Sequence, residues 1–79
     1  MPCYRIRLIN SEFESADEVD YPSIETARHS AIIGATQVLS DSVAKGQASV
    51  AVEIQIYEDD ELTARTIVSL NVADLIDGD

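Results

Sequence analysis

Two alternating runs dominate residues 47–72, which read QASVAVEIQIYEDDELTARTIVSLNV. In the first run, every second residue from Val50 to Ile56 is aliphatic, and in the second run the same period extends from Leu62 to Val72. Strict alternation is typical of β-strands that bury one face. Because only the four acids of residues 58–61 separate the runs, the pattern predicts a β-hairpin with one apolar face, on which Leu62 lies in register with Ala64 and Val68.

A helix is predicted before this hairpin, beginning at Pro22-Ser23 and ending at Lys45-Gly46. Ser23 is a favourable N-cap, Glu25 lies in the first turn, where the helix dipole favours an acid, and Gly46 suits the left-handed position after a helix. At 100° per residue, one side of this helix gathers its apolar residues. They are Ile24, Ala27, Ala31, Ala35, Val38 and Leu39, with Ile32 and Val43 at the flank. Since alanines make this side thin, the helix is expected to lie close against a sheet.

The first strand is predicted at residues 3–10, which alternate in the same way. Its two sides carry Tyr4, Ile6 and Leu8 on one and Arg5 and Arg7 on the other. The acidic residues 11–21 that follow are either a long loop or contain a short second strand at residues 12–15. Both alternatives remain open, because an unstructured connection of this length is unusual in so small a domain.

The order of these elements predicts an α+β fold, in which one helix packs on one face of a mainly antiparallel sheet of three or four strands, β-(β)-α-β-β. The 79 residues fit a single domain over positions 1–79. In the acidic tail, Leu75 and Ile76 are expected to make one helical turn, and residues 77–79 are expected to be mobile.

The charge balance narrows the choice of partner. Fifteen acidic residues against five basic ones give a net charge of −10. Phosphate backbones and anionic lipids both attract basic surfaces, so neither nucleic acid nor a membrane is expected to bind. The N-terminus carries no secretion signal, no apolar run could span a membrane, and a single free cysteine suits a reducing compartment. We therefore expect a cytoplasmic protein whose partner is a protein.

No pattern in the sequence predicts a catalytic, metal or cofactor site. Cys3 is expected to be a small edge residue on the strand face opposite Tyr4, and His29 a surface residue of the helix. The two are therefore not expected to converge as a nucleophile–base pair. The acidic residues 17–20 and 58–61 lack the spacing and the glycine of a calcium loop. The three glycines are isolated, which excludes a phosphate-binding loop. We predict no cofactor and no metal, and an enzymatic role is not favoured.

A candidate interaction surface can nevertheless be named. It consists of Arg5, Arg7, Arg28, Ile33, Tyr57 and Arg65. Most of these residues belong to the sheet face opposite the core. Arg28 is expected to pair with an acid of residues 17–20, and Ile33 falls nearly opposite the apolar stripe of the helix. This mixed surface, or an unpaired edge strand, is where a partner is predicted to dock.

Several short motifs run along the chain: Met1-Pro2-x-Tyr4 before the first strand, Asp17-Glu18 in the acidic segment, and Ser23-Ile24-Glu25-x-Ala27-Arg28-x-x-Ala31 at the start of the helix. With the apolar strand, acidic turn and return strand, they resemble a family of short bacterial proteins, common in rhizobia and their relatives, that has no assigned activity. The resemblance implies a fold rather than a function. The acidic segment and the hairpin turn both lack the glycine expected there.

Two classes of function fit these features. The first is a small acidic protein–protein interaction module that associates with itself or binds a basic partner; an antitoxin-like or nucleic-acid-mimicking inhibitor would be one form of it. The second is a small-molecule-binding domain or weak enzyme that uses a cleft between helix and sheet or at an oligomer interface. The first is favoured because it requires no chemical motif.

Overall fold

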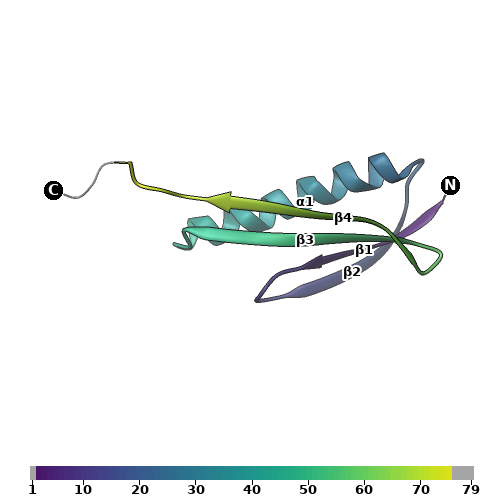
Figure 1. Cartoon of the computed structure of the whole chain (residues 1–79), viewed down its shortest axis with the longest axis horizontal. Helices are drawn as coiled ribbons and strands as arrows, with labels where there is room; N and C mark the ends of the chain where they lie inside the picture. Colours follow the sequence, from purple (N-terminus) through teal and green to yellow (C-terminus); the bar gives the residue numbers. More distant parts are fainter. Residues whose placement is uncertain (1, 76–79) are drawn as a thin grey trace.

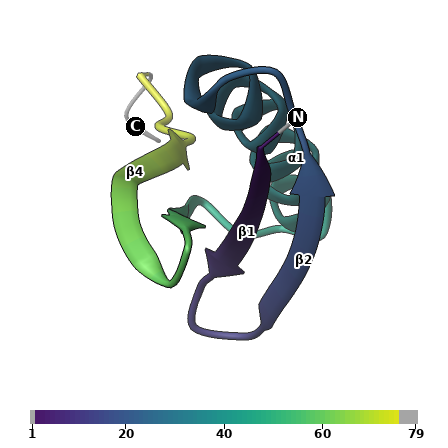
Figure 2. The same cartoon turned by 90° about the vertical axis from the view of Figure 1, so that its right-hand side faces the viewer.

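The computed structural model describes residues 2–75. Its elements are β1 (Cys3–Ile9), β2 (Glu14–Asp20), α1 (Ile24–Ala44), β3 (Ser49–Glu58) and β4 (Glu61–Asn71). The strands form one antiparallel sheet in the order β2-β1-β3-β4, and α1 lies along one face of it (Figure 1). In Figure 2, β2 and β4 lie on opposite sides of β1, at the two edges of the sheet. The predicted α+β fold with one helix on one sheet face is confirmed.

The bounds of α1 follow the predicted signals. The Ser23 hydroxyl accepts a hydrogen bond from the backbone N–H of Thr26 at 3.2 Å, which satisfies a donor that the first turn leaves free. After the C-cap Lys45, Gly46 has φ 103°, a conformation that side chains disfavour. The helix therefore begins and ends where its capping residues stand.

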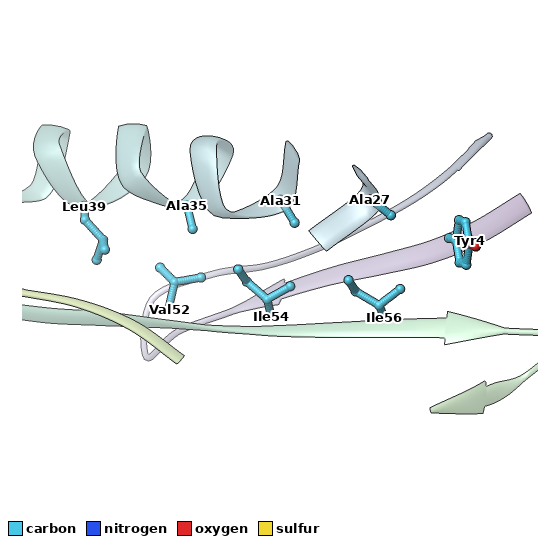
Figure 3. Packing of buried hydrophobic residues seen from close by; sticks show 8 residues of the cluster. All are labelled: Tyr4, Ala27, Ala31, Ala35, Leu39, Val52, Ile54 and Ile56. Carbon is cyan, nitrogen blue, oxygen red and sulfur yellow. The ribbon is translucent and has the colours of Figure 1, made fainter. Parts of the chain in front are cut away.

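The core lies between α1 and the two central strands (Figure 3). Its buried side chains are Ala27, Ala31, Ala35 and Leu39 of α1, Val52, Ile54 and Ile56 of β3, and Tyr4 of β1. The alanine stripe of the helix lies against the sheet, as predicted, and it faces the aliphatic row of β3. Ile24, Ile32 and Val38 are partly buried around it. Because alanine has no long side chain, the helix axis approaches the sheet closely, and the core is thin.

The second strand is present, but its bounds differ from the predicted residues 12–15. β2 starts at Glu14, runs to Asp20 and pairs with the whole of β1, from Cys3 opposite Asp20 to Ile9 opposite Glu14. Residues 10–13 make the turn instead, because the Asn10 side chain accepts hydrogen bonds from the N–H groups of Glu12 (2.8 Å) and Phe13 (2.9 Å). Because Asn10 stabilises this turn, the strand begins two residues later than predicted.

The β3–β4 hairpin contains a bulge that overturns one prediction. Ile56 lies opposite Ala64 and Tyr57 lies opposite Leu62, so Thr63 is an extra residue on β4. Its hydroxyl donates to the carbonyl of Ile56 at 3.1 Å. One extra residue moves the preceding side chain to the other face. Leu62 therefore lies on the side of Tyr57, 46% exposed, and not on the core face.

At the C-terminal end, the structure describes the tail as far as Leu75. Leu75 is not helical and is 94% exposed, so the predicted helical turn is wrong at that residue. Ile76 and residues 77–79 lie outside the described residues.

A first prediction tests the close packing of α1. Ala35→Leu should lower the free energy of unfolding by about 1–3 kcal/mol, because the fully buried site has no room for a larger side chain. The same change at the exposed Gln37, about 200° further around the helix, should stay within about 0.5 kcal/mol of the wild type. Urea unfolding followed by circular dichroism measures both variants. Equal losses would contradict the packing described here.

A second prediction concerns the hairpin turn, where Asp59 and Asp60 have φ 52° and 65°. Such left-handed pairs form the two-residue hairpin turns that favour glycine at the second position. Asp60→Gly should therefore stabilise the domain by about 0.5–1 kcal/mol, measured by urea unfolding. Asp60→Ala is the control, because it removes the same charge without easing the backbone. A gain as large in the alanine variant would assign the effect to charge.

Candidate interaction surface

The sheet face opposite α1, called the open face below, carries every second residue of each strand. These residues are Cys3, Arg5, Arg7 and Ile9 on β1, Glu14, Ala16, Glu18 and Asp20 on β2, Ser49, Ala51, Glu53, Gln55 and Tyr57 on β3, and Leu62, Arg65, Ile67, Ser69 and Asn71 on β4. Their assignment follows from the pairing register and from the burial of their neighbours beneath α1. The open face is therefore a mixed surface of cations, acids and a few apolar side chains.

A hydrogen-bonded network crosses all four strands on this face. Its centre is Gln55, whose Oε1 accepts from Arg7 Nη1 and from the Tyr57 hydroxyl, both at 3.1 Å. Arg7 also pairs with Glu14 on β2. On the other side, Gln55 Nε2 donates to Glu53 Oε2 at 2.7 Å. The network holds these side chains in one arrangement in the unbound chain.

The β4 end of the network is a two-point ion pair. Arg65 donates to Glu53 through Nε at 2.6 Å and through Nη2 at 3.3 Å, the forked geometry that arginine makes with carboxylates. Hydrogen bonds from Arg65 and then Gln55 hold the pKa of the Glu53 carboxyl below its ordinary value. Glu53 is thus a fully ionised acceptor at neutral pH.

Arg5 and Tyr57 form a second cluster beside the network. The Arg5 guanidinium carbon lies 4.6 Å from the centroid of the Tyr57 ring, a cation–π contact, and Arg5 Nη1 lies 3.7 Å from Asp60. Arg5 Nε is buried there without a hydrogen-bond partner among residues 2–75. The position of the Arg5 side chain therefore depends mainly on its contact with the Tyr57 ring.

Cys3 lies at the edge of the same cluster but is not activated. Together with Arg5, Glu18, Tyr57, Asp59 and Asp60, it lines a shallow hollow of about 170 Å³. Partial desolvation of the thiol and the nearby Asp20 carboxylate raise the pKa of Cys3. A thiol with a raised pKa stays protonated at neutral pH and is a poor nucleophile. His29 is exposed on α1, across the sheet from this hollow, so the two residues form no catalytic pair.

Four of the six residues named from the sequence meet on the open face: Arg5, Arg7, Tyr57 and Arg65. The other two, Arg28 and Ile33, are exposed on α1, beyond the core. The predicted ion pair of Arg28 with residues 17–20 is wrong, since no ion pair within residues 2–75 includes it. The physical reason is helix geometry: Ser30 and Gly34 face β2, and Arg28 lies about 200° around the helix from Ser30.

Sequence reasoning missed the apolar part of the surface. Ile67, 66% exposed, lies opposite Glu53 on the open face, and the bulge adds Leu62 beside Tyr57. The sequence carried a signal for Ile67: it alternates with the core-facing residues Thr66 and Val68, so it must lie on the opposite face. No sequence signal marks the bulge that moves Leu62.

A narrow groove separates α1 from the β1–β2 hairpin. Its apolar walls include Ile6, Leu8, Val19, Ala31 and Gly34, and its volume is about 150 Å³. Pockets that bury a drug-sized ligand usually measure roughly 300–1,000 Å³. A groove therefore exists between helix and sheet, where the small-molecule alternative requires a cleft, but its volume is below that of a typical ligand pocket.

Two further observations concern other kinds of site. Among the described residues, no three His, Cys, Asp or Glu side chains are grouped so that they could hold a metal ion. No helix within residues 2–75 combines the length and apolarity that a membrane crossing requires.

Comparison with known proteins returned no family model, no curated protein and no solved structure that matches this chain. The resemblance to the short rhizobial-type family stays a prediction that rests on the motifs quoted above.

A third prediction tests the Glu53–Arg65 pair. Because the pKa of Glu53 is lower in the folded chain, its ionised form stabilises the fold above the unfolded-state pKa, and this stabilisation is lost as the pH falls through the folded-state pKa. Arg65→Gln should therefore destabilise the domain at neutral pH. The free energies of unfolding of the variant and the wild type, plotted against pH, should converge in acid. Carbon-detected NMR titration should show the pKa of Glu53 rising in the variant. A stability difference independent of pH would instead assign Arg65 a packing role.

Proposed function

We propose that this protein is a small protein-interaction module that docks its partner on the open face and the adjoining sheet edge. The observation that carries this proposal is the four-strand network with the adjoining Arg5–Tyr57 cluster, which together hold Tyr57 and three arginines beside the exposed Leu62 and Ile67. The partner is either a second copy of the chain or a basic protein.

Two physical features support this use of the surface. Tyrosine and arginine are enriched at the centres of protein interfaces, because each covers a large area and keeps a polar group for orientation. In addition, side chains that are already fixed in the free chain lose less rotamer freedom when a partner binds. The open face thus offers preorganised contacts next to apolar area that binding would remove from water.

Charge distinguishes the two kinds of partner. The open face itself is nearly balanced, with three arginines and four acids, although the chain carries −10 overall. A basic protein would be attracted by the surrounding acids, and salt would weaken that complex. A second copy would be repelled by the same acids, and salt would strengthen the self-complex. The salt dependence of association therefore separates the two forms of the proposal.

A fourth prediction tests the surface with matched baits. Wild-type protein, Arg65→Glu and Arg28→Glu are immobilised and used to capture proteins from a host lysate, after melting curves have established that each bait is folded. The two variants change the net charge equally, but only Arg65 lies on the open face. Wild type and Arg28→Glu should retain the same stoichiometric partner, which mass spectrometry identifies, and Arg65→Glu should lose it. Equal capture by both variants would contradict docking on the open face.

A further inference from the structure

The two edges of the sheet differ sharply in charge. β2, at one edge, holds four acids in seven residues: Glu14, Asp17, Glu18 and Asp20. β4, at the other edge, has no charged residue from Thr66 to its end at Asn71. Edge strands present unpaired N–H and C=O groups, and charged side chains are a common means of preventing another strand from pairing there. β2 is protected in this way, and the second half of β4 is not.

The unprotected part of β4 also exposes apolar side chains on both of its faces. Ile67 lies on the open face and is 66% exposed. Leu70, opposite Val50, lies on the α1 face and is 37% exposed; Val72, just past the strand, is 50% exposed. An added strand would cover these side chains and satisfy the free backbone groups together. The burial of apolar area and the new backbone hydrogen bonds both favour pairing at this edge.

We infer that β4 pairs antiparallel with β4 of a second copy, about a two-fold axis near Ile67. This inference rests on the proposed function and names the partner in its self-associating form. With the axis perpendicular to the sheet, both copies keep α1 on the same side, and two four-stranded sheets become one continuous sheet of eight strands. The surface is thus an interface for a second copy of this chain.

The register about this axis is self-complementary. Ile67 of one copy lies opposite Ile67 of the other, Thr66 opposite Val68, and Ala64 opposite Leu70. Arg65 lies opposite Ser69, so no like charges face each other across the pair. The acidic β2 strands lie at the two far edges of the combined sheet. A second copy at this edge therefore keeps the β2 acids of the two chains apart, which limits the repulsion between two chains of net charge −10.

The first experiment compares two isoleucine variants by light scattering and sedimentation over a range of concentrations. The wild type should reach twice the chain mass of 8.6 kDa, and added salt should favour the dimer by screening its acids. Ile67→Lys should raise the dimer dissociation constant by about 100-fold, since it sets two like charges opposite each other. Ile33→Lys is the matched control, because Ile33 is also exposed (49%) but lies on α1. It should dimerise like the wild type.

The second experiment tests the register in a Cys3→Ser background, which removes the exposed native thiol. Ile67→Cys should form a disulfide-linked dimer under mild oxidation, since directly opposed residues of antiparallel strands are within disulfide range. Ala16→Cys places an exposed thiol on the open face of the other edge strand, and it should form no disulfide-linked dimer under the same conditions, although it still associates through β4. Equal cross-linking of the two variants would overturn the assignment to β4.

Two other results would also overturn the inference. One is a wild-type chain that stays monomeric up to about 1 mM, where even weak complexes form. The other is a dimer that Ile67→Lys leaves intact. Neither result decides the proposed function, which fails separately if capture of a lysate partner does not depend on Arg65.

Discussion

The structure depends on the contact between the alanine stripe of α1 and the aliphatic row of β3. Ala27 and Ala35 are fully buried in one cluster with Val52, Ile54 and Ile56, and the partly buried apolar residues pack around this cluster. Small side chains on the helix let it approach the sheet, but they also limit how much area each residue removes from water. A domain of 79 residues with so thin a core has a narrow margin of stability.

This one-sided core determines the character of the rest of the sheet. With the helix on one face, the other face must remain compatible with water, so its β1 and β3 positions carry Arg5, Arg7, Glu53 and Gln55. Hydrogen bonds from Arg7 to Gln55 and from Arg65 to Glu53 join neighbouring strands on the side that the core does not reach. The same fixed side chains make the open face suitable for a partner, because the order that stabilises the sheet also preorganises the surface.

The sheet order adds a second constraint, because it leaves β2 and β4 as edges. The acids of β2 face water at one edge, where they oppose strand addition. The neutral half of β4 lies at the other edge, where Ile67 is exposed. Within a chain of strongly negative charge, the exposed Ile67, Leu70 and Val72 thus lie together at or just past the end of one edge strand, and this asymmetry supports the proposed interaction role.

The hydrophobic period of each segment and the capping residues of the helix were enough to predict most elements of this fold from the sequence alone. The alternation of β1 and β3, the helix between Ser23 and Gly46 and the stripe of Ala27, Ala31 and Ala35 are local patterns, and each local pattern predicts which face is buried. Four of the six candidate surface residues followed from the same parity. Only the tertiary structure decided the position of β2, the face of Leu62 and the exposure of Arg28. Each depends on a contact between segments or on a one-residue shift, namely the Asn10 turn, the Thr63 bulge and the flank of α1 that faces β2. A periodic pattern cannot report such events, because one inserted residue reverses every face assignment beyond it.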